Sequence, residues 1–190
     1  MSMLRKRSAI VATLMFATVS PLVGSYVARA SVEEDSAAAV ELDDARIARV
    51  VTAATDQIIF NSKYAQRHAR SQQVVDYANQ LLRENQRMAE EFALVVKRAG
   101  LKPEESALSI LCRIAGLRNL AALHLSKPEK FDQTFLSQSA KFEKRVALLL
   151  QERLIPESQH QSIRTYLESM QSELLGFVDQ ANQLKAELSN

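Results

Sequence analysis

Apolar side chains recur along most of this chain at alternating spacings of four and three residues, the period of an α-helix that buries one side. The pattern is unbroken in two segments. In the middle of the chain the stripe consists of Val74, Ala78, Leu81, Asn85, Met88, Phe92, Val95 and Ala99. Near the C-terminus it consists of Ile163, Leu167, Met170, Leu174, Phe177, Ala181, Leu184 and Leu188. The pattern predicts two long amphipathic helices. Asn85, the single polar member of the first stripe, is expected to set specificity in the core.

Turn signals between the stripes divide the chain into five helices. We expect them over residues 43–69, 71–99, 103–125, 128–154 and from 156 almost to the C-terminus. Ser71 is a favourable N-cap, and Gly100 is the residue type that commonly follows a helix end. Pro103, Pro128 and Pro156 are expected to open the three later helices, because proline is tolerated in the first turn.

The composition supports a purely helical protein. The chain has no tryptophan and only four glycines and four prolines among its 190 residues. Long helices joined by short loops pack side by side with nearly parallel axes. The sequence therefore predicts an all-α fold over residues 43–190, an antiparallel four-helix bundle with one additional shorter helix.

The shorter helix, expected within residues 106–125, carries apolar residues in almost every direction. They are Leu108, Ile110, Leu111, Ile114, Leu117, Leu120, Ala121, Leu123 and Leu125. Such a helix is buried on more than one side. We expect part of its surface to remain for a partner, with Leu117, Leu120 and Leu123 as the candidate docking residues. A helix fully covered by its own bundle is the alternative.

The first 30 residues have the layout of a secretory signal peptide. Three basic residues at positions 5–7 precede an apolar stretch over 9–27, and the small residues Ala28 and Ala30 follow at the positions a signal peptidase reads. We expect cleavage between Ala30 and Ser31, followed by a flexible acidic segment over 31–42. The alternative is an uncleaved membrane anchor, since the apolar stretch is nearly long enough to span a bilayer.

Cleavage would change the charge balance. The first 30 residues hold four of the 24 basic residues and no acid, so the remainder would carry 20 basic against 22 acidic residues. A slightly acidic protein has no electrostatic footprint for nucleic acid. From the signal-peptide layout we expect a protein of the periplasm, attached at most peripherally to the inner membrane through a partner.

Residues that commonly carry chemistry are scattered in this sequence. Cys112 is the only cysteine, and its apolar neighbours indicate a buried side chain. The three histidines, His68, His124 and His160, lie near predicted helix ends without a partner three or four residues away. The glutamates of the later helices fall outside the apolar stripes: Glu143, Glu152, Glu168, Glu173 and Glu187. The sequence therefore predicts no catalytic residue, no cofactor and no metal ligand.

Several short patterns carry a family resemblance. They are Ile47-Ala48, Ser62-Lys63-Tyr64-Ala65 with Ala69 and Ser71, Val75, Tyr77-Ala78, Phe131-Asp132 and Phe135-Leu136. Through them, residues 43–184 resemble a family of exported bacterial proteins of unknown function that has a ferritin-like four-helix bundle. The resemblance implies a ferritin-like fold for most of the chain.

The same family typically places a Glu on its first helix, Asp-His pairs on its second and fourth, and a further His on its last. These positions fall here on Ile58, Glu84-Asn85, Lys141-Phe142 and a residue near Leu174. The inward-facing positions are therefore apolar or an amide. The resemblance implies a bundle that has lost the ligands of a metal site.

We interpret the chain as a cofactor-free, non-catalytic helical protein of the cell envelope that acts by protein–protein contact. One assembly that could use it is a membrane-bound periplasmic oxidoreductase, with this chain as an accessory, stabilising subunit. Two alternatives stay open at this point: a ferritin-like metal-binding protein or oxidoreductase with a displaced site, and an envelope-stress or lipid-associated protein.

Overall fold

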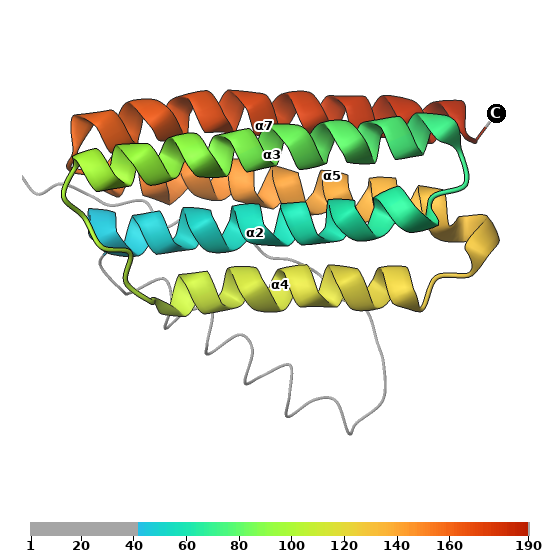
Figure 1. Cartoon of the computed structure of the whole chain (residues 1–190), viewed down its shortest axis with the longest axis horizontal. Helices are drawn as coiled ribbons and strands as arrows, with labels where there is room; N and C mark the ends of the chain where they lie inside the picture. Colours follow the sequence, from blue (N-terminus) through green and yellow to red (C-terminus); the bar gives the residue numbers. More distant parts are fainter. Residues whose placement is uncertain (1–41, 190) are drawn as a thin grey trace, which may run out of the picture. The chain divides into compact units, whose positions relative to one another are not determined.

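A computed structural model describes residues 42–189, and within that range every element is helical (Figure 1). The all-α prediction is confirmed. The long helices are α2 (Asp44–His68), α3 (Gln72–Arg98), α4 (Ala107–His124), α5 (Phe131–Leu149) and α7 (Gln161–Glu187). Short elements fill the connections: η1 (Pro128–Lys130), the π-helical turn η2 (Leu150–Leu154) and α6 (Ile155–Glu157). The signal peptide and most of the acidic segment lie outside the described residues.

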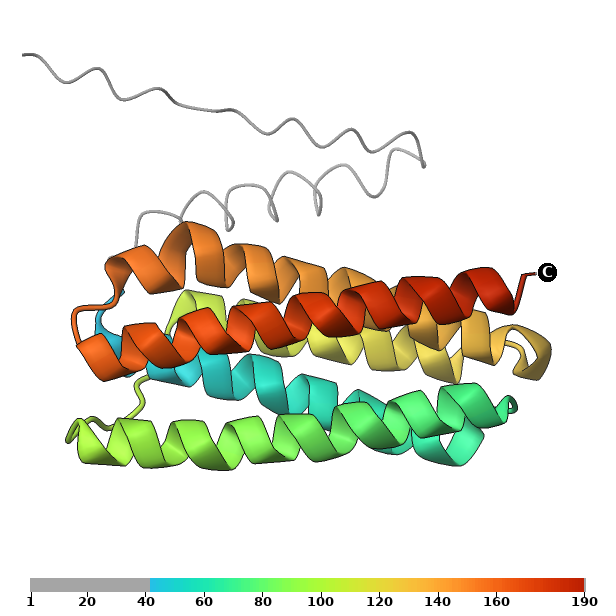
Figure 2. The same cartoon turned by 90° about the horizontal axis from the view of Figure 1, so that it is seen from above.

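The helices lie side by side as a bundle (Figures 1 and 2). α2 and α3 form one antiparallel pair, α5 and α7 form another, and α3 packs against α7. α4 runs along α2 in the same direction and also contacts α5. The shorter helix of the sequence prediction is therefore α4, and it covers the side of the bundle formed by α2 and α5.

The predicted stripes of α3 and α7 form the centre of the core. Leu81, Met88, Leu167 and Leu174 are almost completely shielded from solvent. One detail of the prediction is wrong: Val96, not Val95, is the fully buried valine near the end of α3.

A side chain from α5 holds the corner between α2 and α3. The Asp132 carboxylate accepts hydrogen bonds from the Arg70 and Ser71 backbone amides at 2.9 and 2.7 Å. Ser71 does occupy the N-cap position of α3, but its own side chain makes no capping hydrogen bond. The predicted cap is thus replaced by a carboxylate from a distant part of the chain, which also suits the positive end of the helix dipole.

Two predicted helix starts are wrong. α4 begins after Ser106, not at Pro103, because Ser106 and Ser109 form a reciprocal capping box. Pro156 does not open the last helix, since it lies in α6 directly after the π-helical turn. In a regular α-helix the proline ring would collide with the carbonyl of Glu152, and the wider turn accommodates it.

The start of α2 is fixed by the α6–α7 connection. The Asp44 carboxylate accepts hydrogen bonds from the Ser158 hydroxyl at 2.7 Å and from the His160 amide at 2.8 Å. Leu42 is buried, and its amide donates to Glu157 at 3.2 Å. The prediction of a flexible segment up to residue 42 is therefore wrong for Leu42 itself.

Candidate functional site

α4 has one side in the core and another in solvent. Cys112, Gly116 and Leu123 are buried, whereas Ile110, Ile114 and Leu117 are 45, 39 and 57 % exposed. The spacing of these three exposed residues is four and three, so they line one side of the helix. α4 therefore presents a continuous apolar stripe to solvent.

The three predicted docking residues divide between these sides. Leu117 is exposed, Leu120 is half-buried, and Leu123 is only 2 % exposed. Leu123 lines a cavity with Ile58 of α2 and with Phe135 and Phe142 of α5. The assignment of Leu123 to a docking surface is wrong, because it lies two turns from Gly116 on the side of α4 that faces the bundle.

An apolar groove of about 140 Å³ runs between α4 and α5 beside the exposed stripe. Leu111, Cys112 and Ala115 form its α4 side. Its α5 side consists of Phe142, Arg145, Val146 and Leu149. Burial raises the pKa of the Cys112 thiol to about 11. Cys112 is therefore protonated at neutral pH and contributes an apolar surface, as the sequence predicted.

α4 is held closely against α2. A side chain added at Gly116 would collide with the side chain of Gln57. At one end of the two helices Arg49 and Arg113 share the Glu105 carboxylate, and at the other end the Tyr64 hydroxyl bonds with the His124 ring at 3.1 Å. These contacts fix which side of α4 faces solvent.

Glu143 is the residue that sequence reasoning missed. It is only 1 % exposed, so its assignment to the solvent side is wrong. A second stripe of α5 with perfect four-three spacing carries it inward: Leu136, Ala140, Glu143, Ala147, Leu150 and Leu154. Glu143 falls outside the more conspicuous aromatic stripe of α5, which carries Phe135, Phe142 and Val146. The second stripe was the available signal, and it predicts a buried carboxyl group.

The Glu143 carboxyl group meets Tyr77 of α3. The Tyr77 hydroxyl lies 3.4 Å from Glu143 Oε2 and 3.2 Å from the Phe177 carbonyl oxygen of α7. Burial raises the pKa of Glu143 to about 8, although hydrogen bonds with Tyr77 and Ser139 oppose the shift. A protonated Glu143 is consistent with this geometry. The Tyr77 hydroxyl has one proton and faces two oxygens, and a protonated carboxyl group supplies the second proton.

A small cavity adjoins this pair. Its volume is about 10 Å³, and its lining includes Glu143 and Asn61. Within residues 42–189, Glu143 Oε1 and Asn61 Oδ1 are buried without a hydrogen-bond partner. The volume is close to the lower limit for one water molecule, which can donate to two oxygens. The site is therefore a buried polar cluster with no space for an organic substrate.

Four of the positions at which the family carries metal ligands lie in the core, whereas Glu84 is half-buried and Lys141 is exposed. Ile58, Asn85, Phe142 and Leu174 are all buried. Asn85 Nδ2 donates to the Leu81 carbonyl of its own helix at 2.9 Å, and its Oδ1 has no partner. Over residues 42–189, no three His, Cys, Asp or Glu side chains gather as a possible metal site.

Two histidines, separated in sequence, flank one tyrosine. The His68 ring stacks on Tyr64 with centroids 3.9 Å apart, and the His124 ring lies 4.5 Å from the same tyrosine. His160 is the N-cap residue of α7 and lies in a different connection. The three histidines thus lie at helix ends, and His68 and His124 both contact Tyr64.

The described residues therefore define an all-α helical bundle with an exposed apolar helix face and a buried Tyr77–Glu143 pair. In the same range, no helix is both long enough and apolar enough to cross a bilayer. The chain belongs to the family described as a domain of unknown function, DUF4142, whose model matches residues 29–184. Comparisons with curated proteins and with solved structures gave no match.

Proposed function

We propose that this chain is a non-catalytic helical protein that acts by binding another protein of the cell envelope through α4. The observation that carries the proposal is the exposed apolar stripe of Ile110, Ile114 and Leu117 beside the apolar groove between α4 and α5. Isolated apolar residues are common on protein surfaces, whereas a contiguous patch marks an interaction site.

The energetics favour a partner at this surface. Burying the side chain of a leucine or isoleucine stabilises a complex by about 1.5–3 kcal/mol before the costs of association. The close contact of Gly116 with α2 keeps the stripe in place, so little conformational entropy is lost on binding.

The proposed setting is the periplasm. It rests on the signal-peptide layout of residues 1–30, which lie outside the described range. A stabilising subunit of a membrane-bound periplasmic oxidoreductase is the assembly we favour, because such a subunit needs a docking surface and no reaction centre of its own. N-terminal sequencing of the protein from the cell envelope should begin at Ser31. A chain that retains Met1 would show that the segment is an anchor.

The docking test compares apolar residues on two helices. Leu117→Ser should abolish recovery of one stoichiometric partner from solubilised envelopes, and Leu94→Ser should leave it unchanged. Leu94 is 52 % exposed and lies on α3, so it controls for the loss of an exposed leucine. Both variants should keep the thermal stability of the parent protein. Recovery of the same partner with Leu117→Ser would overturn the proposal.

The proposal also excludes a resident metal. Purified protein incubated with ferrous, copper or zinc ions should contain no stoichiometric metal after desalting. The chemical reason is the apolar and amide character of Ile58, Asn85, Phe142 and Leu174. Metal that survives desalting would favour the metal-binding alternative over a docking subunit.

A further inference from the structure

The groove between α4 and α5 has basic residues along its edges. Arg145 lines the groove, and Lys141 is exposed one turn earlier on α5. Arg118 is exposed on α4, two turns after the groove residue Leu111 and on the same side of the helix. Among the described residues, Arg118, Lys141 and Arg145 take part in no ion pair.

α4 and α5 place no free acidic side chain at the groove. The sequence of α4 contains no Asp or Glu. α5 contains two acids, of which Asp132 accepts the backbone hydrogen bonds of the α2–α3 corner and Glu143 is buried. The remaining base of α4, Arg113, is paired with Glu105. The α4 and α5 edges of the groove are therefore positively charged, and the exposed Glu152 of η2, two turns after Arg145, is the one free acid along the α5 edge among the described residues.

We infer that the partner segment is an amphipathic helix with acidic residues on both sides of its apolar stripe, lying along the α4–α5 groove. This inference rests on the proposed function and adds the chemistry of the partner. The apolar stripe of the partner would contact Ile114, Leu117 and the groove floor. Its acidic residues would pair with Lys141 and Arg145 on the α5 edge and with Arg118 on the α4 rim of the groove, between Leu111 and the exposed stripe.

The dimensions suit such a segment. The exposed stripe from Ile110 to Leu117 is about 10 Å long at 1.5 Å per residue, and with Ala121 it extends to about 16 Å. Amphipathic helices in grooves contact their partners through residues at spacings of three and four over about two turns. The stripe and the groove thus match the footprint of one helix.

The same charges disfavour a second copy of this chain at the face. A two-fold interface brings each surface patch against itself. Arg118, Lys141 and Arg145 of one copy would then approach those of the other, and the exposed Glu152 of η2 offers one acid against these three bases. A foreign acidic segment removes this repulsion and gains charge pairs.

Two synthetic helical peptides serve as probes of the full chain purified from cell envelopes. Both peptides have the same leucine stripe and differ only in flanking residues, Glu in one and Lys in the other. By fluorescence anisotropy at low salt, the Glu peptide should bind at least about tenfold more tightly than the Lys peptide. The difference should shrink as salt is raised to about 0.3 M, because exposed charge pairs are screened.

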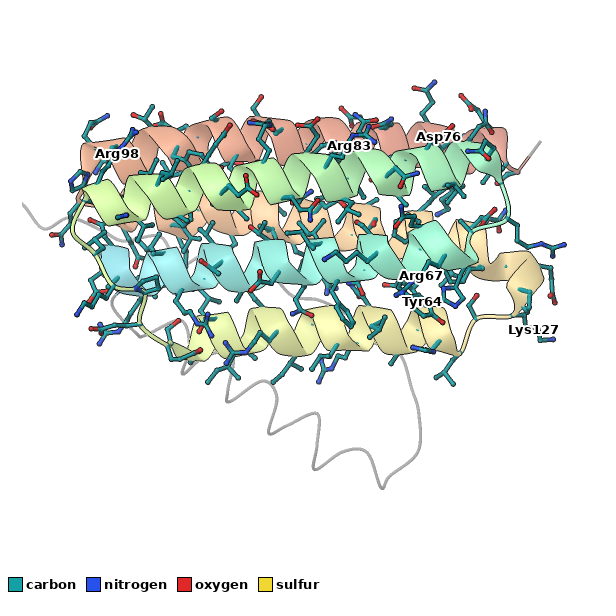
Figure 3. All side chains as sticks on the ribbon, viewed as in Figure 1. Tyr64, Arg67, Asp76, Arg83, Arg98 and Lys127 are labelled. Atoms are coloured by element: carbon teal, nitrogen blue, oxygen red, sulfur yellow. The ribbon has the colours of Figure 1, made fainter. Side chains whose placement is uncertain are left out.

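Charge reversal tests whether the three basic residues at the groove cause the preference for the Glu peptide. The triple variant Arg118→Glu, Lys141→Glu and Arg145→Glu should reverse the preference so that the Lys peptide binds more tightly. The control is Arg83→Glu with Arg98→Glu on α3 (Figure 3), where neither arginine forms an ion pair with another described residue and the preference should stay unchanged.

The outcomes separate the inference from the proposed function. If Leu117→Ser loses the native partner but charge reversal does not, the acidic partner is wrong and docking through α4 stands. If Leu117→Ser keeps the native partner, the proposed function fails. Equal binding of the two peptides, or a protein dimer that Leu117→Ser dissociates, would overturn the inference.

Discussion

α3 and α4 both pack on α2, but they do so in different ways. α3 buries one regular stripe, and its charged residues lie outside: Arg87 bonds with Glu84 and Glu91 of α3 and with Glu173 of α7. α4 buries Cys112, Gly116 and Leu123 and still exposes a second apolar side. The apolar stripe of α3 is covered by other helices of this chain, whereas α4 has an apolar side that the described residues leave uncovered.

Exposed apolar residues are arranged differently on α3 and α4. On α3 the single exposed leucine, Leu94, is an isolated side chain. On α4 the exposed side chains lie in one row beside a groove. We therefore expect changes on the buried side of α3 to alter the stability of the protein. Changes on the exposed side of α4 should alter its function.

The largest expected effect concerns the seam where α3 meets α5. The pKa of Glu143 is about 8 in the folded protein and about 4.5 in the unfolded chain. The folded protein therefore holds a proton that the unfolded chain loses, and the free energy of unfolding should fall as the pH rises from 4.5 to 8. The full loss is on the order of 5 kcal/mol.

Glu143→Gln should remove this pH dependence, because an amide stays neutral. Urea denaturation at several pH values measures it. Glu168→Gln on α7 is the control, since Glu168 is exposed and should leave the slope unchanged. An unchanged slope in Glu143→Gln would show that another group causes the dependence.

The next effect separates the two sides of α4. Leu123→Ala should lower the free energy of unfolding by about 3 kcal/mol, because it leaves a cavity among Ile58, Phe135 and Phe142. Leu117→Ala should change it by less than about 0.5 kcal/mol, since Leu117 is exposed. Denaturant titration of both variants tests the difference. A similar loss in the two variants would contradict the two-sided description of α4.

A smaller effect is expected where α4 approaches α2. Gly116→Ala should destabilise the protein by about 1–3 kcal/mol, because the new methyl group would displace Gln57. Gly176→Ala on α7 is the matched control: no atom lies within 4 Å of the added carbon. That variant should stabilise the helix by about 0.5–1 kcal/mol. Differential scanning calorimetry compares the two melting temperatures.

The smallest effect is expected at Asn85 of α3. Its Oδ1 is buried without a partner, and its Nδ2 bonds only within its own helix. Asn85→Leu should therefore raise the free energy of unfolding by about 1 kcal/mol. Recovery of the partner should not change. A loss of more than about 1 kcal/mol would indicate that a neighbouring helix depends on Asn85.

The helices were predictable from the sequence because their stripes and end signals are local. The α3 stripe up to Phe92 and Gly100, with its positive φ of 69°, agree with the prediction. The errors occur where distant residues decide the outcome. Asp132 caps the α2–α3 corner across about 60 residues, and no pattern near Ser71 signals it. Pro103 is the more conspicuous helix-start signal before α4, but the reciprocal cap of Ser106 and Ser109 sets the start.

The surface of α4 was only partly predictable. The sequence shows that α4 is apolar in almost every direction. Which side faces solvent depends on where α2 lies, and the sequence of α4 does not contain that information. Leu117 and Leu123 look alike in the sequence, and the close contact at Gly116 determines which of them faces solvent. Glu143 could have been found, because the stripe of Leu136, Ala140 and Ala147 contains it.

The Asp132 carboxylate has a consequence for local opening of the bundle. Backbone amides in short exposed connections normally exchange with solvent deuterium quickly, since they open without global unfolding. Here the Arg70 and Ser71 amides are held by a side chain that belongs to α5. Exchange of these two amides therefore requires release of the Asp132 carboxylate, so two amides of a three-residue connection report on the contact between α5 and the α2–α3 corner.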